Sequence, residues 1–170
     1  MTEASETMVK STEAESAEAG KYLTFTLVEE EYGIGILKIK EIIGMMPVTA
    51  VPQTPDFVKG VINLRGKVIP VIDLRMRFGL EATDYTERTC IIVVEMDGQS
   101  GNIMIGIVVD AVSEVLNIKG EDIEDTPAFG AQVQTGFILG MAKMEGGVKI
   151  LLDIDKVISS DTLDFLEEAA

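Results

Sequence analysis

The chain has 170 residues, of which 46% are hydrophobic, and 29 acidic against 14 basic side chains give it a formal net charge of −15. This length allows one domain, or two small ones that share a core, and the hydrophobic content is typical of a folded protein. The negative charge would repel phosphates, so nucleic acid is disfavoured as a partner.

The first 20 residues, MTEASETMVKSTEAESAEAG, are acidic and polar and show neither helical nor strand periodicity. They predict a disordered acidic tail over residues 1–20, and they lack the apolar segment of a secretory signal. No apolar run elsewhere approaches the roughly 20 residues that a membrane helix requires. We therefore expect a cytoplasmic protein that does not insert into a membrane.

Two strands are predicted to open the folded region. In YLTFTLV, residues 22–28, Leu23, Phe25 and Leu27 alternate with the intervening residues, which is the period of a strand with one buried face. An acidic turn follows, and YGIGI, residues 32–36, predicts the second strand. The next stretch, ILKIKEIIG, fits either a helical turn or a strand, because its isoleucines suit both.

Two short helical segments are predicted in the first half. Thr54 suits an N-cap and Pro55 the first helical position, so a helical turn is expected before Val58. Asp73 is placed to cap a second turn, LRMRF, which ends at Gly79.

The stretch between them, GVINLRGKVIPVIDL, is almost wholly apolar apart from its centre. It predicts two strands joined tightly at Arg65 and Gly66, with Asn63 able to hydrogen-bond the turn backbone. Pro70 donates no ladder hydrogen bond, which places the second strand at an edge or near its end there. Arg65 would then point outward, either as a solvated turn residue or as a group that binds a partner's carboxylate or carbonyl.

The second half is rich in strands. TCIIVVEM and NIMIGIVVD predict a hairpin, AVSEVLNI a further strand, and GFILGMAKM and VKILLD a second hairpin across residues 145–147. DIDKVI and the C-terminal DTLDFLEEAA predict short helices. About ten short strands without a crossover helix indicate an all-β barrel or sandwich. No exact internal repeat is visible.

The sequence contains no histidine and one cysteine, Cys90. Ser-His-Asp and Cys-His catalysis and histidine-containing zinc sites are therefore excluded, and no intrachain disulfide can form. Only carboxylate, lysine or tyrosine chemistry remains. GIGILK lacks the spacing of a phosphate-binding loop. We expect no catalytic residues, no cofactor and no metal.

Three other features have ordinary structural explanations. Met45 and Met46 suit a partner contact or, more simply, gap-filling against the barrel. Cys90 opens an apolar strand without nearby cations and is interpreted as a small core residue. Asp153 and Asp155 fit the cap of a helical turn better than a pair of catalytic or cation-binding carboxylates.

FVKGVINLRGKVIPVIDLRMRFG resembles the signature of the CheW-like domain family of bacterial chemotaxis coupling proteins. The resemblance extends to the opening strands YLTFTLVEEEYGIGILKIKEII, the lead-in VTAVPQTPDF, the later segment IGIVVDAVSEVLNI and the closing segment FILGMAKMEGGVKILLDIDKVI. It covers essentially the whole expected ordered region, residues 21–158, between the acidic tail and a C-terminal helical tail over residues 159–170.

The resemblance implies two intertwined five-stranded SH3-like β-barrels that share strands. It also implies a non-catalytic adaptor that binds the regulatory domain of the histidine kinase CheA and the cytoplasmic tip of methyl-accepting chemoreceptors, recruited to membrane-bound receptor arrays. Residues implied in partner contact are Ile39, Glu41, Gly60, Asn63 and Arg65. Two rival hypotheses remain open, a scaffold for a related non-chemotaxis kinase pathway and a carboxylate-dependent β-barrel hydrolase.

Overall fold

A computed structural model describes residues 20–81, 83–98, 101–125 and 136–158. The fold is all-β, as predicted, with only short helices. The elements in chain order are β1 Gly20–Leu27, β2 Glu30–Gly35, η1 Ile36–Lys38, β3 Ile39–Gly44, β4 Val58–Leu64, β5 Lys67–Asp73, α2 Leu74–Arg77, β6 Cys90–Gly98, β7 Gly101–Val109, β8 Ala111–Ile118, η2 Gly120–Asp122, β9 Ile123–Glu124, β10 Ile138–Met144, β11 Gly147–Leu152 and α3 Ile154–Val157.

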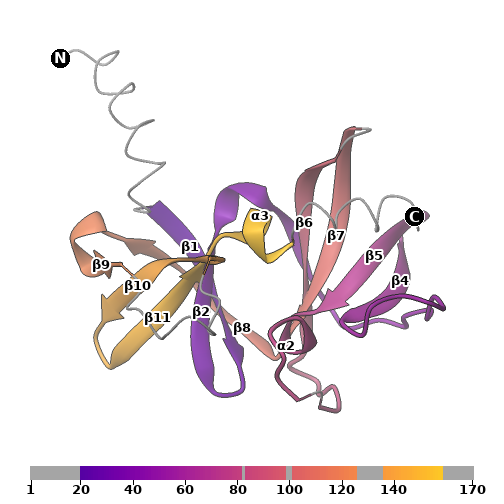
Figure 1. The fold of residues 1–170 in the computed structure, drawn as a ribbon, viewed down its shortest axis with the longest axis horizontal. Helices are drawn as coiled ribbons and strands as arrows, with labels where there is room; N and C mark the ends of the chain where they lie inside the picture. The colour runs from indigo at the N-terminus through magenta and orange to yellow at the C-terminus, as the bar shows by residue number, and fades with distance from the viewer. Residues whose placement is uncertain (1–19, 82, 99–100, 126–135, 159–170) are drawn as a thin grey trace.

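The strands form two sheets that lie side by side along the long axis of the molecule, with α2 and α3 between them (Figure 1). Sheet A has the order β8-β1-β2-β11-β10-β9, and sheet B has the order β3-β6-β7-β5-β4. The chain passes from sheet A to sheet B through η1 and returns at Asp110, between β7 and β8. The two units are therefore intertwined as expected, although each described strand belongs to one sheet and sheet A has six strands rather than five.

Both sheets bury side chains on both faces. One large core lies between the sheets and includes Phe25 of β1, Ile92 of β6 and Ile107 of β7. Each sheet also curves around a smaller core of its own, one containing Tyr22 and the other Ile91. The prediction that β1 buries only one face was therefore wrong, because Tyr22 and Thr24 are buried as well as its leucines and Phe25. Thr24 is tolerated there because its hydroxyl donates to the Glu114 carbonyl at 2.9 Å.

The two sheets have the same topology, although the sequence shows no exact repeat. Strands β3, β6, β7, β5 and β4 of sheet B correspond to β8, β1, β2, β11 and β10 of sheet A, and each sheet contains one parallel pair. The Asp73 N–H donates to the Phe57 carbonyl at 2.7 Å, and the Asp153 N–H donates to the Phe137 carbonyl at 2.9 Å. Three further pairs of identical residues are separated along the chain by the same number of residues as Asp73 and Asp153. They are Gly60 and Gly140, Gly66 and Gly146, and Val68 and Val148. The fold is therefore a duplication.

The two capped helices were predicted correctly. The Asp73 carboxylate accepts the Met76 N–H at 3.4 Å at the start of α2, and Asp153 accepts the Asp155 N–H at 3.1 Å at the start of α3. Gly79 follows α2 in a left-handed conformation with φ of 78°.

The turn predicted before Val58 forms, but it is not helical and Thr54 does not cap it. The Thr54 hydroxyl donates to the Val51 carbonyl instead of capping a helix. The turn before Val58 is closed by a hydrogen bond from the Val58 N–H to the Pro55 carbonyl at 2.9 Å. The ambiguous stretch ILKIKEIIG divides into η1 and β3.

Both hairpins of the second half form, as β6–β7 and β10–β11. Strand β5 pairs with β7 only from Val71 onward. Pro70 is therefore tolerated, because no ladder hydrogen bond to β7 is required of its missing N–H. β1 starts at Gly20, the last residue of the predicted tail, and the rest of that tail and the C-terminal helix lie outside the described residues.

Gly60 is required by internal packing. It lies at a bulge in β4 with φ of +139°, and a Cβ at this position would lie 1.9 Å from the Thr49 carbonyl oxygen. Thr49 and Val61 exchange two backbone hydrogen bonds of 2.8 and 2.9 Å, so the segment after β3 pairs with the outer edge of β4. This pairing brings the two edges of sheet B together.

We predict that Gly60→Ala destabilises the protein by about 2–4 kcal/mol, because the new methyl group displaces Thr49 and the backbone is strained. Gly35→Ala is the matched control, since nothing lies within 4 Å of its Cβ position, and should change stability by less than about 0.5 kcal/mol. Urea unfolding of both variants measures the difference. Equal stabilities would contradict the Thr49–Val61 pairing.

Candidate partner-binding surfaces

The β4–β5 turn presents Arg65 to solvent. Arg65 and Gly66 both have positive φ, 53° and 88°, as in a tight type I′ hairpin turn. The Asn63 side chain accepts the Gly66 N–H at 2.7 Å, as the sequence predicted. The Arg65 side chain is 68% exposed and contacts the Glu41 carboxylate of β3. The structure thus brings together Glu41, Asn63 and Arg65 at one corner of sheet B.

The backbone conformation of Arg65 does not itself favour arginine. A left-handed backbone disfavours residues with a Cβ by roughly 1–2 kcal/mol, and asparagine or glycine is the usual occupant. The exposed ion pair with Glu41 contributes at most about 1 kcal/mol. Turn formation and the ion pair with Glu41 together therefore do not favour arginine over asparagine at this position.

Ile39 and Gly60 occupy different environments from this corner. Ile39 is half-buried and packs against the core between the sheets. Gly60 is buried beneath Thr49, so its role in any partner contact is to shape the hairpin. In β4, Ile62 is buried in the core of sheet B, and Val61 lies half-exposed on the opposite face.

An apolar seam, defined here as Ile39 and Ile42 of β3 with Val112 and Val115 of β8, follows the edge strands of the two sheets. In register, Ile39 lies opposite Val94 and Ile42 opposite Ile92, while Val112 lies opposite Phe25 and Val115 opposite Leu23. Directly paired residues share a face of a sheet. All four opposing residues belong to the core between the sheets, so the seam residues project on that side.

The seam combines anchored and exposed apolar groups. Ile39 and Val112 are half-buried against the core, whereas Ile42 is 42% and Val115 is 54% exposed. Of the four seam residues, only Ile39 was named from the sequence. The orientation of Ile42, Val112 and Val115 depends on strand register, which the sequence does not reveal. The two strands occupy corresponding positions in the duplicated sheets.

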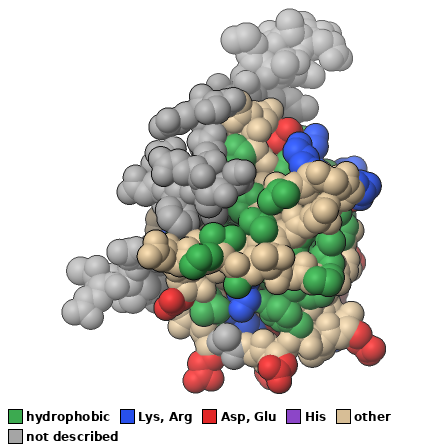
Figure 2. All heavy atoms as spheres, turned by 90° about the vertical axis from the view of Figure 1, so that its right-hand side faces the viewer, with side chains coloured by type: hydrophobic (Ala, Val, Ile, Leu, Met, Phe, Trp, Pro, Cys, Tyr) green, Lys and Arg blue, Asp and Glu red, His purple; other side chains and the backbone are tan. Residues whose placement is uncertain are grey.

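Further exposed hydrophobic side chains lie outside the seam. Leu37 of η1 is 97% exposed, and Val68 and Val148 are 53% and 52% exposed at corresponding positions of the two sheets. Figure 2 shows that the end of the molecule formed by sheet B presents many hydrophobic side chains with few charges among them. Apolar groups ringed by polar ones are typical of protein–protein interfaces.

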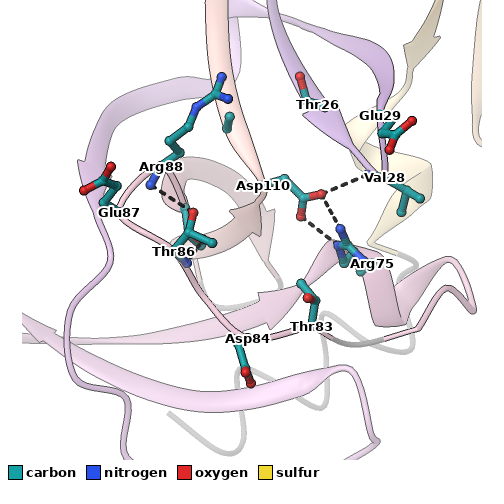
Figure 3. Close-up of a pocket in the computed structure, with 12 residues that line it drawn as sticks. Thr26, Val28, Glu29, Arg75, Thr83, Asp84, Thr86, Glu87, Arg88 and Asp110 are labelled. Carbon is teal, nitrogen blue, oxygen red and sulfur yellow. Dashed lines mark hydrogen bonds and ion pairs between the residues drawn. The ribbon is translucent and has the colours of Figure 1, made fainter.

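A second cluster of charges lies at the Asp110 crossing (Figure 3). The Arg75 guanidinium donates two parallel hydrogen bonds to the Asp110 carboxylate, at 2.8 and 2.6 Å, and the Val28 N–H donates to the same carboxylate at 2.8 Å. Burial alone would raise the pKa of Asp110, but the hydrogen bonds from Arg75 and Val28 outweigh it and hold the pKa below its usual value. A hollow of about 540 Å³ adjoins the cluster and is bordered also by Glu29, Asp84, Thr86, Glu87 and Arg88.

The remaining candidates have structural roles. Met45 and Met46 pack against the core of sheet B, and Cys90 is partly buried against the core between the sheets. Asp153 caps α3, while Asp155 pairs with Lys38 at 3.0 Å. Within the described part of the chain, no group of three or more cysteine, aspartate or glutamate side chains is arranged to hold a metal ion. The same residues contain no helix long and apolar enough to cross a membrane.

Comparisons with known proteins agree with this geometry. A model of the CheW-like domain family matches residues 21–162. The chain is 42% identical over 150 residues to the chemotaxis protein CheW of Klebsiella aerogenes, with 88% of each chain covered. It is 32% identical to chemotaxis protein CheW of Bacillus subtilis, covering 88% of this chain and 93% of that one. The crystal structure of scaffolding protein TtCheW from Thermoanaerobacter tengcongensis superposes with a TM-score of 0.73 and 37% identity, covering 85% and 95% of the two chains.

We predict that Arg65→Asn is more stable than Arg65→Gln by about 0.5–1 kcal/mol. Both variants lose the contact with Glu41, but only asparagine suits the left-handed backbone at this position. The free energy of unfolding in urea measures the difference. If glutamine is tolerated equally well, the turn does not hold Arg65 in this conformation.

Proposed function

Because the chain belongs to the CheW-like domain family, and is accordingly a chemotaxis coupling adaptor, we propose that it joins two macromolecules without catalysing a reaction. The partners proposed are the regulatory domain of the histidine kinase CheA and the cytoplasmic tip of methyl-accepting chemoreceptors. The proposed location is the cytoplasm, at membrane-bound receptor arrays. The main support is the identity to chemotaxis relatives across most of the chain.

The apolar seam is the proposed contact for the receptor. A helical hairpin tip offers an apolar stripe, which packs into a groove through side chains one turn apart. Ile39 and Val112 are held by the core beneath them, so they provide a rigid base, and Ile42 and Val115 expose apolar surface beside it. Little conformational entropy is lost when such anchored side chains bind.

The Arg65 corner is the second proposed contact surface, formed by Glu41, Asn63, Arg65 and the exposed Val68. Asn63 and Val68 lie directly opposite each other in the β4–β5 hairpin, so an apolar side chain is flanked by polar ones. Gly60 contributes indirectly, through the bulge that seats Thr49 against β4. A pattern of this kind suits docking of another β-domain through its strand ends.

A carboxylate-dependent hydrolase receives no support from the two candidate acids. Such an enzyme needs a pair of carboxylates with divergent pKa values facing a substrate. Asp153 is used as a helix cap and Asp155 pairs with a lysine. A scaffold for a non-chemotaxis kinase pathway would use the same surfaces, but the names of the relatives favour chemotaxis.

The central experiment is co-sedimentation of the chain with CheA and a receptor fragment, together with measurement of CheA autophosphorylation. The chain should associate with both partners and make phosphorylation depend on the receptor. Failure to associate with either partner would overturn the proposal.

We predict that Arg65→Glu weakens at least one of the two associations by about tenfold, because it replaces a presented guanidinium by a carboxylate beside Glu41. Lys119→Glu changes the net charge equally at an exposed position just after β8 and is the control. Binding to each isolated partner, measured by calorimetry, identifies the partner that Arg65 contacts. If both affinities equal those of the control, Arg65 has no binding role.

We predict that Ile42→Asp weakens receptor binding by about tenfold while binding to the kinase domain changes little, because a charge in the seam must be desolvated. Val148→Asp introduces the same charge at a comparably exposed valine outside the seam and should leave receptor binding intact. A titration of receptor fragment against each variant distinguishes them. Equal losses in the two variants would remove the seam from the receptor contact.

A further inference from the structure

Over the described residues the chain crosses between the sheets twice, and each crossing is tied by an ion pair to a short helix. The first crossing, at η1, is tied to α3 through Lys38 and Asp155 at 3.0 Å. The second, at Asp110, is tied to α2 through Arg75. Because α2 and α3 follow corresponding strands of the duplicated sheets, the two junctions are equivalent in the fold.

The two junctions differ strongly in construction. The Lys38–Asp155 pair is a single contact whose side chains are 34% and 54% exposed. Arg75 and Asp110 are only 18% and 24% exposed and share two parallel hydrogen bonds, the arrangement that fixes both distance and angle. Arg75 also donates to the Glu81 carbonyl at 3.1 Å, and Asp110 accepts the Val28 N–H, so four segments meet here.

The turn held by Asp110 is strained. Val28 and Glu29, between β1 and β2, have φ of 52° and 82°, and a left-handed conformation is a genuine outlier for a β-branched residue. Such a conformation persists only where its surroundings impose it. The hydrogen bond from the Val28 N–H to Asp110 supplies that constraint from a position far along the chain (Figure 3).

Apolar packing alone specifies orientation weakly. The core between the sheets resists their separation, but hydrophobic attraction is non-directional and permits packed layers to slide. A bidentate guanidinium–carboxylate contact is directional, and its geometry is lost on rotation of either partner.

We propose that Arg75, Asp110 and the Val28 N–H form a clamp that positions sheet A relative to sheet B. The clamp thereby also fixes the spacing of β3 and β8, the edge strands of the apolar seam. The effect of this spacing on receptor binding rests on the proposed function. Arg75 and Asp110 are positioning residues, since they line neither the seam nor the Arg65 corner. The equivalent Lys38–Asp155 junction does not share this role.

The test measures the distance between the sheets in the full-length chain. Spin labels are attached at Val68→Cys of sheet B and Val148→Cys of sheet A, two exposed and equivalent positions, after Cys90→Ser removes the one native cysteine. Pulsed electron resonance should give a narrow distance distribution, which Arg75→Ala broadens or shifts.

Two further variants make this result decisive. Asp155→Asn, at the equivalent junction, should leave the distribution narrow. Arg75→Lys keeps the charge without the two-pronged geometry, so it should also broaden the distribution, and it decides the question if Arg75→Ala does not fold. A distribution unchanged by Arg75→Lys or by a folded Arg75→Ala, or one changed equally by Asp155→Asn, overturns the clamp.

A second measurement separates this proposal from the proposed function. Arg75→Lys should reduce receptor-dependent stimulation of CheA about fivefold or more, while binding to the isolated kinase domain is retained. If the unmodified chain binds neither partner, the proposed function fails and the distance measurement still decides the clamp. If the distances change but stimulation does not, the clamp positions the sheets without influencing coupling, and the seam consequence is wrong.

Discussion

The core shared by the two sheets determines where this protein can interact. Each sheet wraps around its own small core on one face and packs against the common core with the other, so the central strands have no free face. In β6, for example, Ile91 and Ile92 are both fully buried, on opposite sides. Partners can therefore reach only edge strands, turns and corners. Several exposed hydrophobic side chains lie there, on β3, β8 and near the starts of β5 and β11, and the proposed contacts use those on β3, β8 and β5.

The local features of the fold could be predicted from the sequence because each depends on neighbouring residues. Asp73 and Asp153 mark helix starts, and Arg65-Gly66 and Glu145-Gly146 mark hairpin turns. The burial of Thr24 could not be predicted, since its hydroxyl is satisfied by a carbonyl of β8, far along the chain. The turn at Thr54 was mistaken for a helix start for the same reason, because pairing of the adjacent Thr49 with β4 determines the path of that segment.

The candidate surfaces show the same division. Asn63 and Arg65 lie in one hairpin, so a local motif predicted their proximity, whereas the Glu41 contact depends on the two edges of sheet B meeting. The seam was almost entirely invisible in the sequence. A bulge in each of the β3 and β8 pairings sets which residues face the common core, and a one-residue change of register would reverse their orientation.

The duplication explains both the symmetry of the fold and the difference between its halves. Identical residues survive where backbone geometry demands them, as at Gly60 and Gly140, which accommodate an adjacent segment. Elsewhere the halves have diverged. The position of Arg65 in sheet B corresponds to Glu145 in sheet A, and the guanidinium of Arg75 corresponds to the carboxylate of Asp155. The proposed binding of two different partners would use unlike surfaces on a common scaffold, and a charge difference such as that between Arg65 and Glu145 discriminates between partners through repulsion as well as attraction. The two halves thus share the glycines that accommodate an adjacent segment, whereas their turn charges and the ion pairs at their junctions differ.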